Sequence, residues 1–281
     1  MHERVSINGR LVKASEARLP AVTGATMHGR GVFTTLAVYH GRPFLWEAHW
    51  SRLAEHAARA GVEMPFAEAE GHGALAKLIE ANKVTRGRAR LTVLARAARG
   101  PWAVADVGGP ASDLLIWTGD ERKSEDETLS LTVSPHRLNT FSPLAGVKSV
   151  NYLDHVLAWE EARSRDFDEA VVLNERGEVV SATMANLFWV KHGTAHTPAL
   201  QTGALAGTTR ARVMELAEEL AVPVVEGAYT LHDVGDAEEI FLTSSALGVA
   251  LVTAFDFHRY TVPVGSVALR LHEAFRQLTL A

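Results

Sequence analysis

The chain has 281 residues, with 28 Lys plus Arg against 33 Asp plus Glu, a formal net charge of −5, 47% hydrophobic residues and no cysteine. This composition is typical of a globular protein and excludes a disordered or fibrous chain. The slightly acidic balance offers no diffuse basic surface, so we expect no nucleic-acid partner. The lack of cysteine excludes disulfides, thiolate metal sites and cysteine nucleophiles.

Apolar segments in this chain are short. Residues 1–6 lack the apolar core of a secretory signal, and no run approaches the length needed to cross a bilayer. We therefore expect a cytoplasmic protein with no membrane partner. The length favours two domains.

The first part of the chain alternates strand-like and helix-like segments. The turn pair Asn8-Gly9 predicts a hairpin between two short strands. Composition and turn signals predict strands over 4–7, 10–13, 32–39 and 88–96, and helices over 45–60 and 68–82.

Residues 120–127 are all charged apart from Ser124, which is typical of an exposed connection. We place the domain boundary there, between an N-terminal domain over 1–119 and a C-terminal domain over 128–281. In the second domain, Leu129, Leu131 and Val133 alternate with polar residues and predict a half-buried strand. Further predicted strands cover 170–173, 179–183, 186–191 and 240–242. Predicted helices cover 152–165 and 208–220, and Thr208 or Thr209 is expected to cap the second of them.

Several common motifs are incomplete in this chain. The pairs Gly29-x-Gly31 and Gly71-x-Gly73 do not complete a dinucleotide-binding GxGxxG, and segment 203–209 lacks the lysine of a phosphate-binding P-loop. The serine-hydrolase GxSxG and the zinc-protease HExxH do not occur. His49 and His56 stand two turns apart on one predicted helix, a spacing more typical of a solvated face than of a metal pair. We therefore expect no metal site.

Lys148 has unusual neighbours. It lies among small and apolar residues in segment 143–154, just before a predicted helix. Desolvation lowers the pKa of an amine, which is the condition for a lysine that forms Schiff bases. The alternative is a lysine whose stem lies along apolar surface while its amine reaches water. The segment alone leaves both interpretations open.

Hydroxyl groups downstream indicate a phosphate site. Gly207-Thr208-Thr209-Arg210 opens a predicted helix, and hydroxyls with free N–H groups at a helix start bind phosphate. Ser245 can add a hydroxyl and Arg52 a bidentate positive charge. A phosphate-bearing aldehyde cofactor would explain both the lysine and this cradle, although each hydroxyl cluster alone is typical of an ordinary cap or turn.

In this order, these residues resemble the fold-type IV pyridoxal phosphate enzymes: branched-chain aminotransferases, D-amino acid aminotransferases and aminodeoxychorismate lyases. The matches span nearly the whole chain and include Ile7-Asn8-Gly9, Gly29-x-Gly31-Val32-Phe33, His49-x-x-Arg52-Leu53, Lys148 with Asn151, Asp168-Glu169-Ala170, Leu173-Asn174-x-x-Gly177, Ala185-Asn186-Leu187-Phe188 and Gly207-x-Thr209-Arg210. The resemblance implies an α+β or α/β fold, with a smaller N-terminal α/β domain and a larger C-terminal domain on a mixed sheet. It also implies a homodimer.

The same resemblance implies roles for individual residues. The cofactor would be pyridoxal 5'-phosphate, and the catalytic Lys148 would hold its aldehyde. Its phosphate would be held by Arg52, Thr208, Thr209 and Ser245. For the carboxylates of a small anionic amine substrate, the candidates are Thr35, Arg96 and Arg99, although both arginines are equally typical of an exposed loop.

Two residues depart from the family pattern. Arg30 stands where the family usually has an aspartate, and Ser181 stands where its carboxylate meets the pyridine nitrogen of the cofactor. A carboxylate keeps that nitrogen protonated and the ring a strong electron sink, whereas a serine hydroxyl can only hydrogen-bond. Glu178 could replace the carboxylate only if the strand register shifted by three residues. We therefore expect Ser181 to weaken amino transfer more than elimination.

Three functions are consistent with the sequence. The first is a lyase that converts 4-amino-4-deoxychorismate to 4-aminobenzoate, a folate precursor, and pyruvate. Phe33-Thr34-Thr35 and Pro143-Leu144-Ala145-Gly146-x-Lys148 look most like the lyase branch, and the transaminase branches more often have glutamate where this chain has Thr34. The second is an aminotransferase for branched-chain or D-amino acids. The third is a cofactor-binding protein in which Ser181 marks lost or altered activity.

Overall fold

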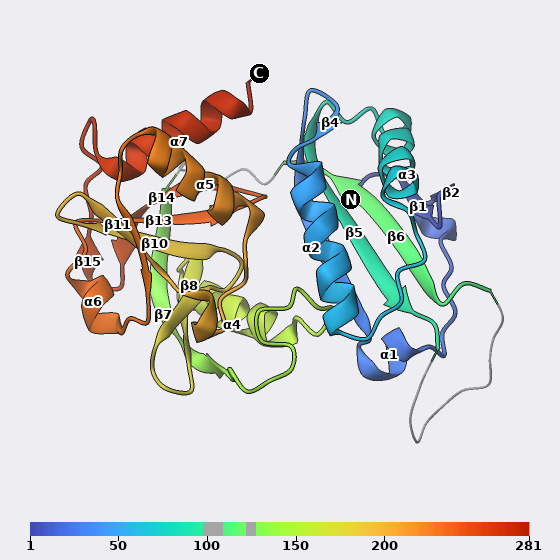
Figure 1. Cartoon of the computed structure of the whole chain (residues 1–281), viewed down its shortest axis with the longest axis horizontal. Helices are drawn as coiled ribbons and strands as arrows, with labels where there is room; N and C mark the ends of the chain where they lie inside the picture. Colours follow the sequence, from blue (N-terminus) through green and yellow to red (C-terminus); the bar gives the residue numbers. More distant parts are fainter. Residues whose placement is uncertain (98–108, 122–127, 281) are drawn as a thin grey trace. The chain divides into compact units, whose positions relative to one another are not determined.

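The structure is a computed structural model that describes residues 1–97, 109–121 and 128–280 (Figure 1). The chain forms two compact units, Met1–Arg122 with Val147–Tyr152, and Lys123–Gly146 with Leu153–Ala281. Each unit is built on its own β-sheet, which confirms the expected mixed fold. Residues 122–127 of the predicted connection lie outside the described part. No helix in that part is long and apolar enough to cross a membrane.

The first unit is built on an antiparallel sheet in the order β2-β1-β6-β5-β3-β4. Its strands are β1 (Arg4–Ile7), β2 (Arg10–Lys13), β3 (Gly31–Tyr39), β4 (Arg42–Pro43), β5 (Arg86–Ala95) and β6 (Ser112–Gly119). The predicted hairpin is confirmed, because Ile7 pairs with Arg10 across the Asn8-Gly9 turn. The strand expected to start at residue 88 begins at Arg86, and β6 escapes the sequence prediction.

Helices cover one face of this sheet. They are α2 (Trp46–Arg59), which packs on β3, and α3 (Glu68–Ala81), which packs on β1 and β6, while the short α1 (Gly24–His28) packs near β5. A Cβ atom at Gly71 of α3 would lie 2.3 Å from the Trp50 ring of α2, so glycine allows the two helices to meet. Because side chains alternate along a strand, Thr34 of β3 points toward α2 and Phe33 and Thr35 point to the opposite face.

The second unit is built on a mixed sheet whose strand order is β12-β11-β10-β13-β14-β7-β8-β9, with β15 paired to β14. The β11–β12, β14–β7 and β7–β8 pairs are parallel. The strands are β7 (Thr128–Leu138), β8 (Glu169–Asn174), β9 (Val179–Ala182), β10 (Asn186–Lys191), β11 (Thr194–Pro198), β12 (Val224–Gly227), β13 (Glu239–Ser244), β14 (Gly248–Phe255) and β15 (His258–Arg259).

Four helices of the described part pack on this sheet: α4 (Leu153–Ser164), α5 (Thr208–Glu219), α6 (Leu231–Gly235) and α7 (Val267–Leu278). α4 lies against β7 and β8, and α5 and α7 lie against β13 and β14. Leu131, Val171 and Leu187 form one core cluster with Val234 of α6. The stacked rings of Phe188 and Phe241, 5.0 Å apart, join β10 to β13. The centre of β13 is apolar and buried, because it consists of Ile240, Phe241 and Leu242.

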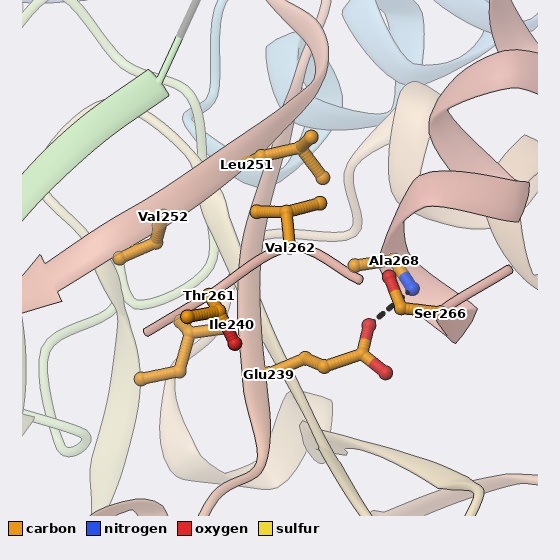
Figure 2. Close-up of a pocket in the computed structure, with 8 residues that line it drawn as sticks. All are labelled: Glu239, Ile240, Leu251, Val252, Thr261, Val262, Ser266 and Ala268. Carbon is orange, nitrogen blue, oxygen red and sulfur yellow. Dashed lines mark hydrogen bonds between the residues drawn. The ribbon is translucent and has the colours of Figure 1, made fainter. Parts of the chain in front are cut away.

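Glu239, at the start of β13, joins that strand to α7. Its carboxylate accepts hydrogen bonds from the backbone N–H groups of Val267 and Ala268, at 3.1 and 2.7 Å, while Ser266 caps the helix from its own side chain. Figure 2 shows Glu239 aimed at the helix start, beside a small depression lined by β13 and β14. The carboxylate therefore has a structural role, since an anion at a helix N-terminus satisfies N–H groups that lack an internal partner.

Replacing this anchor is expected to destabilise the second unit. Glu239→Ala removes two charge-assisted hydrogen bonds, and we expect a loss of about 1–2 kcal/mol in the free energy of unfolding, measured by urea denaturation. Glu238→Ala is the matched control, because that neighbouring side chain is exposed and makes only a surface pair with His192. Equal effects of the two variants would contradict the anchoring role.

Candidate active site

Lys148 belongs structurally to the first unit, although it follows the predicted linker in sequence. The backbone N–H of Phe33 donates to the carbonyl of Lys148 at 2.9 Å, and Val150 N–H donates to the carbonyl of Gly31 at 2.9 Å. The backbone N–H of Lys148 donates to Nδ1 of His56 at 3.0 Å. Both peptide groups of Lys148 are therefore fixed, one by β3 and the other by α2.

The segment after Lys148 is held by Asn151. Its amide donates to the carbonyl of Gly29 at 2.7 Å, and Gly29 has a positive φ of 61°. A Cβ atom at Gly29 would lie 2.2 Å from Oδ1 of Asn151. The Gly29 and Asn151 matches noted in the sequence are thus parts of one local contact, which requires glycine.

The amine of Lys148 lies between two aromatic rings. Its Nζ is 4.6 Å from the centroid of Phe33 and 4.8 Å from that of Tyr152, and 3.4 Å from the Tyr152 hydroxyl. The two rings meet edge to face at 5.2 Å. Burial, together with the positive charges of Arg52 and Arg90, lowers the pKa of Lys148 to about 7. This geometry favours the reactive interpretation of Lys148 over that of an amine in water.

The predicted solvated face of α2 is wrong: His49 and His56 are 1% and 2% exposed. Together with Arg52 they form a buried polar stripe at helical spacing, directed toward β3 and Lys148. Burial lowers the pKa of His49 well below its usual value and that of His56 to about 4, and the charge of Arg52 acts in the same direction on both. Both imidazoles are therefore neutral at neutral pH. A neutral imidazole allows Nδ1 of His56 to accept the hydrogen bond from the Lys148 N–H.

Thr34 links two members of this stripe. Its hydroxyl accepts a hydrogen bond from Nη2 of Arg52 at 3.1 Å and lies 2.7 Å from Nδ1 of His49. Because a guanidinium can only donate, the Thr34 hydroxyl is the acceptor for Arg52, and the same oxygen links Arg52 to the His49 imidazole. Burial lowers the pKa of Arg52 to about 10, so it stays charged at neutral pH. Thr34 therefore orients the guanidinium that the sequence marks for phosphate.

The phosphate candidates of the second unit meet at the start of α5. The expected threonine cap is wrong, because Gly207 is the N-cap and Thr208 and Thr209 are the first helical residues. A Cβ atom at Gly207 would lie 2.0 Å from Oδ1 of Asn186, so only glycine fits. The hydroxyls of Thr208 and Ser245 are 3.5 Å apart. With no side chain capping the helix start, its N–H groups suit an anion.

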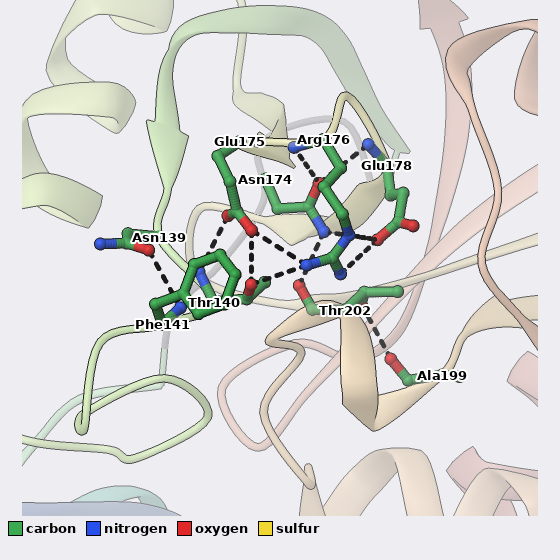
Figure 3. Close-up of polar contacts among 9 residues, drawn as sticks. All are labelled: Asn139, Thr140, Phe141, Asn174, Glu175, Arg176, Glu178, Ala199 and Thr202. Carbon is green, nitrogen blue, oxygen red and sulfur yellow. Dashed lines mark hydrogen bonds and ion pairs between the residues drawn. The ribbon is translucent and has the colours of Figure 1, made fainter.

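Ser181 is buried on β9, at 7% exposure, and pairs with Val172 of β8. The alternative carboxylate, Glu178, is engaged elsewhere (Figure 3). It accepts hydrogen bonds from Asn174 at 2.7 Å and from Nη2 of Arg176 at 2.6 Å. The Arg176 hydrogen bond lowers the pKa of Glu178 and holds it ionised. Glu178 is therefore committed to the turn between β8 and β9.

The substrate candidates are placed differently from one another. Thr35 lies on the Phe33 face of the sheet, opposite Arg90 of β5. Arg96 makes a two-pronged ion pair with the buried Asp113, at 2.8 and 2.7 Å, and so joins the end of β5 to β6. Arg99 lies outside the described residues. Arg90, which sequence reasoning missed, lies with its Cζ 3.5 Å from the Phe33 centroid.

Comparison with known proteins identifies the family. The sequence pattern of the class IV amino-transferases matches residues 31–255. The chain belongs to this family. Its members depend on pyridoxal phosphate and include both aminotransferases and aminodeoxychorismate lyases.

Relatives of both kinds match over nearly the whole chain. A protein of Methanocaldococcus jannaschii, provisionally named a branched-chain-amino-acid aminotransferase, is 30% identical over 278 residues, which cover 98% of this chain and 96% of the relative. Aminodeoxychorismate lyase of Bacillus subtilis is 27% identical over 279 residues, covering 97% and 94%. The structure of a branched-chain aminotransferase of Thermoproteus uzoniensis with norvaline superposes with a TM-score of 0.90 at 27% identity, covering 100% of this chain and 95% of that one.

The residues present fit pyridoxal phosphate, the cofactor of this family. An amine with a pKa of about 7 suits an aldehyde, since the neutral form is the nucleophile. The glycine-opened start of α5, beside the hydroxyls of Thr208 and Ser245, suits a phosphate group. Arg52 supplies a guanidinium of the kind that binds phosphate bidentately.

The depressed pKa of Lys148 predicts how cofactor capture depends on pH. The rate at which cofactor-free protein takes up pyridoxal phosphate should rise with pH, with a midpoint of about 7, because only the neutral amine reacts. Borohydride trapping followed by peptide mapping measures this rate at Lys148. Arg90→Met should move the midpoint upward, because it removes a neighbouring positive charge. A midpoint near 10, or an adduct on another lysine, would overturn the assignment.

Arg52 is predicted to hold the cofactor phosphate. Arg52→Ala should weaken the affinity for pyridoxal phosphate by about tenfold to a hundredfold, since a charge-assisted pair is lost. Arg59→Ala, on an exposed position of the same helix, is the control. Affinity for pyridoxal, which lacks the phosphate, should fall less in Arg52→Ala than affinity for pyridoxal phosphate does. An Arg52→Ala protein that binds both compounds like the wild type would refute the role.

Proposed function

We propose that this protein is a pyridoxal-phosphate-dependent lyase that converts 4-amino-4-deoxychorismate to 4-aminobenzoate and pyruvate. The observation that carries the proposal is the buried Ser181 at the position of the family's carboxylate, with Glu178 engaged by Arg176 and Asn174. Full-length similarity to an aminodeoxychorismate lyase supports it. The same comparisons include aminotransferases, so the choice between the two reactions rests on the residues of the site.

Under this proposal, the residues that the family resemblance marks would hold pyridoxal phosphate. Lys148 holds the aldehyde, and Ser181 faces the pyridine nitrogen. The phosphate is held by Arg52, Thr208, Thr209 and Ser245. When bound, pyridoxal phosphate supplies an electron sink for the carbon that bears the substrate's amine.

Lys148 moves the protons of the reaction. Its amine takes the proton from the amine-bearing carbon, and the resulting ammonium donates a proton to the methylene of the departing enolpyruvyl group. The C–O bond to that group breaks, and the two fragments are 4-aminobenzoate and pyruvate, with no other reactant needed. A pKa of about 7 suits both roles, because the lysine exchanges protons readily near neutral pH. Tyr152 and Phe33 keep the amine in place.

Ser181 favours elimination over amino transfer. A serine hydroxyl carries no charge and cannot keep the pyridine nitrogen protonated, so the ring withdraws electrons weakly. Amino transfer depends on that electron withdrawal in both half-reactions, from the aldehyde form of the cofactor to its amine form and back. Elimination from aminodeoxychorismate depends on it less, because loss of a ring proton and of enolpyruvate creates an aromatic product. The substrate thereby supplies driving force that the cofactor lacks.

An aminotransferase for branched-chain or D-amino acids is the second candidate, supported by the M. jannaschii relative. A cofactor-binding protein with altered activity is the third. We also infer a homodimer, on the resemblance, and a cytoplasmic location, on composition. Sedimentation of the purified protein tests the dimer.

One substitution separates the candidates. We expect wild-type protein to release pyruvate from 4-amino-4-deoxychorismate and to convert its cofactor to the amine form only slowly with a panel of L- and D-amino acids. Ser181→Glu should speed that conversion by about tenfold or more, because a carboxylate beside the pyridine nitrogen would keep that nitrogen protonated, and should change pyruvate release less. Ser181→Ala is the control for the loss of the hydroxyl alone. Brisk amino transfer by the wild type would refute the lyase assignment.

A further inference from the structure

Three arginines lie in a row on one face of β5. Arg86, Arg88 and Arg90 alternate with Gly87 and Ala89, so their side chains leave the same face of the sheet. Their partners on β3 are Tyr39, Ala37 and Thr35 in turn. This is the face that carries Phe33, away from α2. The arginines therefore extend along the strand from the ring that Lys148 also contacts.

The first of these arginines is neutralised by the protein. Nε of Arg86 donates to Glu121 at 2.8 Å, and its guanidinium lies 4.8 Å from the Tyr39 centroid. The hydrogen bond to Glu121 raises the pKa of Arg86. Arg86 thus forms an ordinary surface ion pair with Glu121 and also packs on the ring of Tyr39.

The other two have no carboxylate partner among the described residues. Arg90 lies over the Phe33 ring, with its Nε 3.5 Å from the hydroxyl of Thr92. Arg88 is half-buried, and its Nε is buried without a hydrogen-bond partner in the described structure. Two adjacent cations without a counter-ion repel each other and leave donors unsatisfied. An anionic ligand would relieve both costs.

We propose that Arg90 and Arg88 bind two carboxylates of one substrate, with Arg88 as the residue that selects for the second, remote carboxylate. This inference rests on the proposed function, because Phe33 places Arg90 beside the amine of Lys148. The two arginines stand two residues apart on the strand, a separation of about 6.5 Å. That spacing suits carboxylates separated by several bonds, and each guanidinium can grip one through two N–H groups. Substrates with a single carboxylate use Arg90 alone.

Calorimetric titration of the holoenzyme with succinate and with butyrate tests the assignment, because the two acids share a four-carbon chain and differ in one carboxylate. We expect succinate to bind more tightly in the wild type. Arg88→Met should weaken succinate binding by about tenfold or more and leave butyrate unchanged. Arg88→Lys should recover part of the loss, since it restores the charge without the fork. Arg86→Met is the matched control and should affect neither acid.

Other outcomes overturn the proposal. Wild-type protein that does not prefer succinate, or an Arg88→Met variant that retains succinate affinity, would remove Arg88 from the substrate site. An Arg88→Met variant that loses both acids equally would show a general structural role, and circular dichroism of the variant would record any loss of fold. Borohydride trapping at Lys148 tests the proposed function separately. If Arg88 governs the preference for succinate but Lys148 carries no cofactor, the carboxylate subsite is supported and the proposed lyase function is refuted.

Discussion

The double attachment of the Lys148 peptide is the constraint on which the candidate site depends. Its carbonyl accepts from β3 and its N–H donates to His56 of α2, so the lysine cannot shift without breaking a strand contact and a buried histidine contact. With the backbone fixed, the side chain has few conformations, and its amine lies between Phe33 and Tyr152. A lysine normally loses much side-chain entropy when it is confined. Here neighbouring elements hold the confined conformation before any ligand arrives.

The electrostatics of the first unit follow from this confinement. Arg52 on α2 and Arg90 on β5 both act on an amine that burial has already made less basic. The neighbouring histidines add no charge, because burial keeps them neutral. A region with cations and few anions is costly for the free protein and favourable for an anionic ligand. The same charges that weaken the lysine's hold on its proton therefore attract phosphate and carboxylate groups.

The sequence predicts where the helices and strands lie better than it predicts which of their faces are buried. Alternation and turn residues locate β1, β2 and β10, and composition locates α2 and α5, because these signals are local. The polar stripe of α2 could not be read in the same way. His49, Arg52 and His56 look like a solvated face in isolation, and only the pairing of α2 with β3 places them beside Thr34 and Lys148. The missed strand β6 and the missed contact of Arg90 with Phe33 likewise depend on the pairing of distant segments.

The register of β9 decides which face of the sheet Ser181 lies on, and a bulge in this strand makes that face unreadable from the sequence. Val171 pairs with Ala182, and Val172 with Ser181, but Leu173 pairs with Val179, so Val180 is an extra residue in this strand. Strict alternation from Val179 would put Val179 and Ser181 on one face. The bulge instead puts Val179 with Ala182 in the core cluster and leaves Ser181 outside that cluster, beside Val172. A hydroxyl is thus the polar group that β9 presents on that side, and the carboxylate of Glu178, just before the strand, is held by Arg176. Under the proposed function, the cofactor ring would receive no negative charge from β9, which is the condition under which a substrate that becomes aromatic has the advantage.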